Sequence, residues 1–374
     1  MNKDQTWIKK DSDIRKISDR LSRIANILLL NGSFIENPGL LNGKMGIAIF
    51  FYNYARYTKN KLFKDYAGEL IDEIYEEINS NTPVSFEDGL TGIGWGIEYL
   101  VKNKFVQADT DEVLTDIDSA LYRTRLQSPI LIKDGNDIFG YGLYYLMRLY
   151  GKEADDDNLG TLVKKYHLVF LTDECERILI QKLYSRYGIE SLKVNSVISF
   201  IWFLLEIERL RIFPVKARKI LSSAPEYVID GLQNSDDFAG KGLLQMLTEK
   251  TINVIKDKCT MDLLKDLLIR NGNNDPLIPS SDESLVAGFI KYTWQQLVYY
   301  SLPVKGGIII SFDKIFSIIN DENNWTQRLN SINKDNLGLT DLAGLGLGLL
   351  MLQNGLHKAQ GSGNRTQSTV QLDD

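Results

Sequence analysis

Residues 89–100 read GLTGIGWGIEYL, which places four glycines in and around the start of an apolar helix. A glycine inside a helix costs about 1 kcal/mol relative to alanine. Related stretches lie at 39–52 (GLLNGKMGIAIFFY), 136–147 (NDIFGYGLYYLM), 237–247 (DFAGKGLLQML) and 340–352 (TDLAGLGLGLLML). Their recurrence indicates a repeat architecture in which contacts between neighbouring repeats compensate for the glycines.

The repeat is about 50 residues long. The equivalent glycines are Gly46, Gly94, Gly142, Gly242 and Gly346, separated by 48, 48, 100 and 104 residues. Each long interval contains a weakened copy, at 195–210 and 284–300, which makes seven units in all. Apolar residues three and four apart predict amphipathic helices between these segments. They are Ile14, Ile17, Leu21, Ile24 and Leu28; Phe63, Tyr66, Leu70, Ile74 and Ile78; Val113, Ile117 and Leu121; and Ile252, Ile255, Leu263 and Leu267.

Helices that are apolar on every side alternate here with half-exposed ones. This alternation predicts two concentric rings, an all-α (α/α)7 toroid with seven inner and seven outer helices. A solenoid of helical hairpins also alternates, but its inner helices need not be apolar all round, so the toroid is favoured. We expect one domain over residues 1–355 and a disordered polar tail over 356–374.

The composition excludes several classes of protein. The net charge is −6 and no basic stripe is present, which argues against nucleic acid as a partner. No apolar run approaches the ~20 residues of a membrane span. The N-terminus is charged and lacks the apolar segment of a signal peptide, and two cysteines cannot form a disulfide framework. We therefore expect a cytoplasmic protein.

The segments GLLNGKMG (39–46), GLTGIGWG (89–96) and DLAGLGLG (341–348) resemble the inner-helix motifs of the lanthionine synthetase C-like (LanC-like) family. The resemblance covers residues from about 14 to 355. It implies an (α/α)7 toroid whose cyclase members bind zinc at the mouth of a central cavity. In those members two cysteines and a histidine hold the zinc, which activates the cysteine thiols of a precursor peptide.

The zinc ligands of the family are missing from this sequence. The segments before the fifth and sixth inner helices, NSDDFAG (234–240) and SDESLVAG (281–288), contain neither cysteine nor histidine. The chain has only Cys175, Cys259, His167 and His357. Both cysteines continue apolar patterns of outer helices, so we expect them to be buried. The sequence predicts no zinc site of the family type and no cofactor.

Polar residues that precede the inner helices are expected to ring one mouth of the toroid. They are Asn42, Lys44, Glu87, Asp88, Asp134, Asp137, Asn195, Asp236, Asp237, Asp282, Glu283 and Asp341. Either Asp134 or Asp137 corresponds to an aspartate that lies near the reacting peptide in family members. Such an acidic mouth favours a peptide with basic or hydroxyl groups over a nucleotide.

Acidic residues before neighbouring inner helices allow two interpretations. Asp236, Asp237, Asp282 and Glu283 could supply oxygen ligands to a hard cation such as calcium. The same residues could simply cap the helices and favour their dipoles, which is the interpretation that we prefer. The GIGWG segment is not interpreted as a dinucleotide site, because no convincing strand precedes it.

The sequence thus predicts a zinc-less LanC-like protein that binds a ribosomally made precursor peptide or assists its modification. The expected partner is that peptide or a peptide-maturation enzyme, and a catalytically silent binding module fits these features. The alternative is a carbohydrate-active toroid, which needs two carboxylates about 5–5.5 Å or 6.5–9.5 Å apart. Asp88, Asp137, Asp237 and Asp341 are the candidates for such a pair, with Asp137 and Asp237 the first catalytic candidates.

Overall fold

The computed structural model describes residues 11–127, 135–150, 158–184, 194–233, 238–272, 281–299, 312–333 and 336–362. Over these ranges the chain is helical and contains no β-strand, which confirms the all-α class. None of the helices in these ranges is long and apolar enough to cross a membrane.

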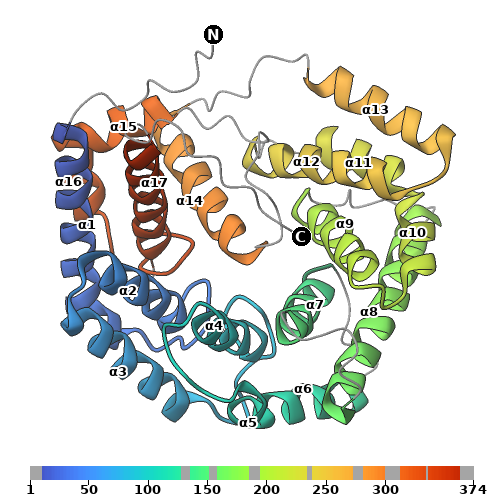
Figure 1. Ribbon diagram of the computed structural model, residues 1–374, viewed down its shortest axis with the longest axis horizontal. Coiled ribbons are helices and arrows are strands. Elements are labelled where there is room, and N and C mark those ends of the chain that lie inside the picture. The colour runs from blue at the N-terminus through green and yellow to red at the C-terminus, as the bar shows by residue number, and fades with distance from the viewer. Residues whose placement is uncertain are drawn as a thin grey trace.

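The glycine-led segments and their two weakened copies form one set of helices that contact each other in chain order. They are α2 (Lys44–Thr58), α4 (Leu90–Lys102), α7 (Gly135–Leu149), α9 (Val194–Arg209), α12 (Phe238–Val254), α14 (Asp282–Val298) and α17 (Leu342–Ser362). Each helix of this set contacts the next, and α17 contacts α2. Figure 1 shows them around the middle of the view, with the red α17 beside the blue α2. We call this set the inner helices.

The remaining helices lie outside the inner set (Figure 1). They are α1 (Asp11–Asn31), α3 (Lys61–Glu77), α5 (Thr110–Val113), α6 (Thr115–Gln127), α8 (Leu159–Tyr184), α10 (Pro214–Leu221), α11 (Ala224–Gln233), α13 (Lys258–Gly272), α15 (Phe312–Asn320) and α16 (Glu322–Asn330), with a short 3₁₀ turn, η1 (Gly32–Phe34). Their apolar stripes face inward: in α1, Ile17, Leu21, Ile24 and Leu28 are fully buried. We call them the outer helices.

The glycine at one position of the repeat lies against an aromatic ring of the next inner helix. The pairs are Gly94 of α4 with Tyr144 of α7, Gly142 of α7 with Phe203 of α9, and Gly346 of α17 with Phe50 of α2. A Cβ on these three glycines would come within 2.4, 2.8 and 2.4 Å of the ring carbons. Carbon atoms pack no closer than about 3.5 Å. The rings therefore occupy the space that a side chain would need.

At a second position of the repeat, the glycine lies against the loop that precedes its own helix. A Cβ on Gly92 would lie 2.0 Å from the carbonyl oxygen of Phe86 and 2.9 Å from Cβ of Leu40. In the last repeat, a Cβ on Gly344 would lie 1.9 Å from the carbonyl oxygen of Leu339. These contacts are with backbone atoms, so a change of rotamer cannot relieve them. The glycines thereby fix where the polar loops sit above the inner helices.

Some predicted boundaries differ from the structure. The stripe from Ile252 to Leu267 does not form one outer helix, because α12 ends at Val254 and α13 begins at Lys258. Asp257 accepts a hydrogen bond from the Thr260 backbone N–H (2.7 Å) and caps the new helix, which explains the break. The stripe from Val113 to Leu121 is likewise divided between α5 and α6.

Helix α17 continues to Ser362, beyond residue 356, where the predicted polar tail begins. Residues 363–374 lie outside the described part of the chain.

Replacing Gly92 by alanine tests the close contacts of the glycine repeat. The new Cβ would collide with the Phe86 carbonyl, so we expect Gly92→Ala to lower the free energy of unfolding by about 2 kcal/mol or more. Gly68 of α3 is the matched control, because its Cβ would find only the Tyr52 hydroxyl at 3.9 Å. Gly68→Ala should stabilise the protein by up to about 1 kcal/mol through helix propensity. Urea denaturation measures both, and equal effects would contradict the packing explanation.

Candidate functional site

Three of the loops that lead into inner helices are hydrogen-bonded to one another through side chains. Oδ1 of Asp88 accepts from the side-chain amides of Asn37 (2.7 Å) and Asn42 (3.1 Å). The Thr340 hydroxyl donates to Oδ1 of Asn42 (2.8 Å), and Oδ2 of Asp341 lies 3.0 Å from the same hydroxyl. Residues from the first, second and last repeats thus meet in one polar group.

Backbone bonds join the same three loops. The Leu41 N–H donates to the Glu87 carbonyl (2.8 Å), and the Thr340 N–H donates to the Leu41 carbonyl (3.3 Å). Gly39 allows this approach, because a Cβ there would lie 2.3 Å from Cα of Asp88. We call residues 37–42, 87–88 and 338–341 the rim. Of the predicted mouth residues, the structure brings Asn42, Asp88 and Asp341 together in it.

Asp341 is half-buried at the rim. Burial raises the pKa of its carboxyl group, and the hydrogen bond from Thr340 only partly offsets this. The carboxylate form of Asp341 is therefore destabilised in the folded protein relative to the unfolded chain.

Lys44 does not present its charge at the rim. Its side chain is buried, and its amine forms ion pairs with Glu73 (2.7 Å) and with Glu77 of the outer helix α3. Burial acts against the charged amine, but these two partners outweigh it and raise the pKa of Lys44 overall. The residue joins α2 to α3 and is not available to a ligand as a free cation.

Other predicted mouth residues are exposed. Glu87 belongs to the rim, while Asp282 and Glu283 form the first turn of α14. Ser281 caps that helix by accepting from the Ser284 N–H (3.2 Å), so the two acidic residues add to the helix dipole rather than provide the cap. Asn195, at the start of α9, accepts a hydrogen bond from Lys291 of α14 (2.9 Å).

Four predicted site residues cannot be placed. Asp134, Asp236 and Asp237 lie outside the described residues. Asp137 lies in α7, but its side chain is not among those described. The two first catalytic candidates are therefore not part of the geometry given above.

Cys175, Cys259 and His167 lie on the outer helices α8 and α13. Cys175 is buried in α8, and burial raises the pKa of its thiol well above the usual value. Cys259 lies on α13 and is exposed, so the expectation that both cysteines are buried is wrong for Cys259. His167 of α8 is buried with its ring stacked on Tyr145 (4.5 Å between centroids). In the described part of the chain, no group of three or more metal-ligating side chains is placed to hold a metal ion.

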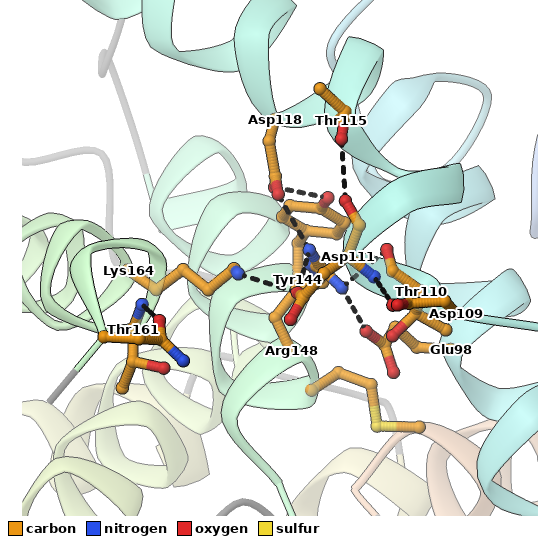
Figure 2. Close-up of polar contacts among 12 residues, drawn as sticks. Glu98, Asp109, Thr110, Asp111, Thr115, Asp118, Tyr144, Arg148, Thr161 and Lys164 are labelled. Carbon is orange, nitrogen blue, oxygen red and sulfur yellow. Dashed lines mark hydrogen bonds and ion pairs between the residues drawn. The ribbon is translucent and has the colours of Figure 1, made fainter. Parts of the chain in front are cut away.

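A buried charged cluster lies between the inner helices α4 and α7 and the outer helices α5, α6 and α8 (Figure 2). Its centre is Arg148, whose side chain is 0% exposed. The guanidinium donates to Glu98 (2.6 Å), and also to Asp111 and Asp118 (2.8 Å each). The Tyr144 hydroxyl donates to the other oxygen of Asp118 (2.6 Å). We call these side chains and the lysines that pair with them the Arg148 cluster.

Two lysines also belong to the Arg148 cluster. Lys102 pairs with Glu98 (2.9 Å), and Lys164 of α8 pairs with Asp111 (3.0 Å). Burial alone would lower the pKa of Arg148, but its charged and hydrogen-bonding neighbours outweigh burial and raise it. A cluster of this kind holds the inner helices α4 and α7 to the outer helices α5, α6 and α8.

The Arg148 cluster was not among the predicted sites, although charged residues inside apolar helices indicate it in the sequence. Glu98 and Arg148 are charged residues inside otherwise apolar inner helices, 50 residues and so about one repeat apart. A buried charge must be paired, and adjacent repeats are the natural place for the partner.

No protein-family model and no curated protein matches this chain. The rim and the Arg148 cluster must therefore be interpreted from their own geometry.

Replacing Arg148 by methionine should strongly destabilise the fold. The substitution keeps much of the side-chain volume but removes the guanidinium that pairs with Glu98 and Asp118. Breaking a buried ion pair costs about 3–5 kcal/mol. Lys265→Met is the matched control, because Lys265 pairs with Asp262 on the protein surface (3.8 Å), where both side chains are more than half exposed. That loss should cost about 1 kcal/mol or less. Chemical denaturation of both variants measures the difference, and a mild effect of Arg148→Met would contradict the role of the cluster.

The raised pKa of Asp341 predicts a pH-dependent effect of Asp341→Asn. A carboxyl group whose pKa is higher in the folded state binds more protons there, so its contribution to stability falls as pH rises above the unfolded value of 3.8. Removing the charge should therefore stabilise the protein more at pH 7 than at pH 4. Melting temperatures of both proteins across this range provide the test. A constant difference would show that burial of Asp341 does not perturb its ionisation.

Proposed function

We propose that this chain is a zinc-less LanC-like (α/α)7 toroid whose acidic rim binds a precursor peptide or assists its modification. The order of helix contacts supports the toroid, because α17 returns to α2 and every inner helix contacts the next. An open solenoid would leave its first and last repeats apart. The contact between a glycine and an aromatic ring recurs at Gly94, Gly142 and Gly346, whereas Gly46 lies against the Leu40 carbonyl, as Gly92 lies against the Phe86 carbonyl.

The rim is the observation that carries the proposed function. Its loops come from sequence-distant repeats, yet side-chain and backbone hydrogen bonds hold them together at the N-terminal ends of α2, α4 and α17. Holding polar groups in place before a ligand arrives reduces the entropy lost on binding. Loops positioned by a rigid scaffold are where binding residues most often lie.

The charge of this end of the molecule indicates the type of guest. Glu87, Asp282 and Glu283 are exposed acidic residues before or at the start of inner helices, while the buried Lys44 is already paired. Carboxylates accept hydrogen bonds from ammonium, guanidinium and hydroxyl donors. A peptide segment with lysine, arginine, serine or threonine side chains suits such a surface.

The proposal assigns binding rather than zinc-dependent cyclisation to this chain. The cyclases of the family activate a thiolate on a zinc ion, which requires soft sulfur and nitrogen ligands near the mouth. Here the two cysteines lie on the outer helices α8 and α13. The rim offers carboxylate, amide and hydroxyl groups, which can orient a peptide but do not form that ligand set.

Peptide binding to variants of Glu87 in the rim and of Asp282 and Glu283 at the start of α14 tests this proposal. A short labelled peptide rich in lysine and serine should bind the protein, and a peptide with glutamate in place of lysine should not. The triple variant Glu87→Gln, Asp282→Asn, Glu283→Gln should weaken binding about tenfold or more at physiological salt, measured by fluorescence anisotropy. The control variant Glu69→Gln, Asp72→Asn, Glu76→Gln removes the same charge from exposed positions of the outer helix α3 and should leave affinity unchanged.

Three outcomes would contradict the proposal. Equal losses in the two triple variants would mean that net charge, and not the acidic residues at the starts of α4 and α14, attracts the peptide. Stoichiometric zinc in the purified protein, measured by metal analysis, would overturn the zinc-less assignment. Hydrolysis of a glycan that is lost in Asp137→Asn or Asp237→Asn would favour the carbohydrate-active alternative.

A further inference from the structure

A basic pocket lies at the opposite end of α2 and α4 from the rim. Its volume is about 310 Å³, and it is formed by the end of α2, the start of α3 and the turn after α4. The lining residues are Tyr52, Ala55, Arg56, Lys59, Asn60, Lys61, Lys64, Lys104 and Phe105. Pockets that bind small molecules have volumes of about 300–1,000 Å³, so this one can hold a small ligand.

Five of these lining residues carry a positive charge, although the chain as a whole has a net charge of −6. Lys61 pairs with Asp65 (2.9 Å). Lys59, Lys64 and Lys104 are exposed and form no ion pair within the described residues. Cationic side chains gathered around one concave site concentrate positive potential there and favour an anionic ligand.

Two of the lysines hold backbone conformations that normally favour glycine. Lys59, the C-cap of α2, has φ 56°, and Lys104 has φ 57°. Within the described residues, Arg211 is the one other non-glycine residue with positive φ. Side chains in this region cost free energy that glycine avoids. Lysine at both positions places charge in the pocket at the expense of stability.

The start of α3 shows a similar conflict between charge and stability. The helix dipole favours acidic residues in the first turn, but α3 has none and carries Lys61 and Lys64 instead. Asn60 caps the helix by accepting from the Leu62 N–H (3.0 Å). A bound anion would interact favourably both with these lysines and with the N-terminal end of the helix.

Arg56 adds a cation that is held in place. Its guanidinium lies 3.6 Å from the centroid of the Phe105 ring and donates to the Asn103 carbonyl (2.6 Å). The Phe105 ring in turn contacts Tyr52 (5.7 Å between centroids). Stacking on an aromatic ring orients the guanidinium, whose several N–H groups can donate to more than one acceptor.

We propose that this pocket binds the phosphate group of a small phosphorylated metabolite. A phosphate monoester carries nearly two negative charges and three acceptor oxygens, which suits several lysines, an arginine and a helix N-terminus at once. A single carboxylate would leave most of these donors unused. The site is distinct from the rim, and its function does not depend on peptide binding there.

Binding of ribose 5-phosphate, measured by calorimetry, tests the proposal. We expect a dissociation constant in or below the millimolar range, with weaker binding of inorganic phosphate and no specific binding of ribose. The double variant Lys59→Gly, Lys104→Gly should weaken binding about tenfold or more. It should also keep or raise the melting temperature, because glycine relieves both positive φ angles. The loss of affinity would then not reflect unfolding.

Arg211→Gly is the matched control. It also removes a cation at a positive φ, but Arg211 lies between α9 and α10, away from the pocket. Its melting temperature should rise or stay constant, and affinity for ribose 5-phosphate should not change.

Several results would overturn the phosphate proposal. They are no binding of ribose 5-phosphate at millimolar concentration, equal binding of sulfate at the same ionic strength, equal affinity of the double variant and the parent protein, or binding only of a phosphoserine peptide. None of them bears on peptide binding at the rim, because that assay uses different residues and a different ligand.

Discussion

The contact between a glycine and an aromatic ring of the next inner helix is the constraint on which the rest of this structure depends. It occurs at the same repeat position in Gly94 with Tyr144, Gly142 with Phe203, and Gly346 with Phe50. Because the ring fills the space of the missing side chain, these three pairs of neighbouring helices pack in the same way. The last of these contacts joins α17 to α2, so the same interaction that builds the series also connects its ends.

The glycine contacts also position the polar parts of the molecule. Tyr144 packs its ring against Gly94 and donates its hydroxyl to Asp118, which in turn binds Arg148. The packing of Tyr144 between α4 and α7 thus orients its hydroxyl toward the Arg148 cluster (Figure 2). At the N-terminal ends of α2 and α4, Gly39 and Gly92 bring the rim loops close enough for their side chains to form hydrogen bonds.

The two ends of the inner helices differ in charge. The N-terminal ends of α4 and α14 present Glu87, Asp282 and Glu283, whereas the pocket at the C-terminal end of α2 collects lysines. A helix dipole places partial positive charge at its N-terminus and negative charge at its C-terminus. The charges of these side chains are therefore opposite in sign to the partial charges of the helix termini beside them.

The sequence by itself determined the helical class, the repeat of about 50 residues and the helices that are apolar all round, because these follow from spacing along a single segment. Even the weakened copies at 195–210 and 284–300 form helices, α9 and α14. The division at Asp257 and the extension of α17 were missed, since a cap or a weak amphipathic turn shifts a helix end without changing the apolar pattern.

Only the tertiary structure decided which charges are paired. The position of Lys44 in the sequence predicted a mouth residue, but its amine forms ion pairs with Glu73 and Glu77 on α3. Asn42 accepts a hydrogen bond from Thr340, which lies 298 positions away in the sequence. Lys59 and Lys104 line the same pocket. Periodicity specifies which face of a helix is buried, but not which residue of a distant repeat lies opposite. That depends on how closely the helices approach, which the glycine contacts set.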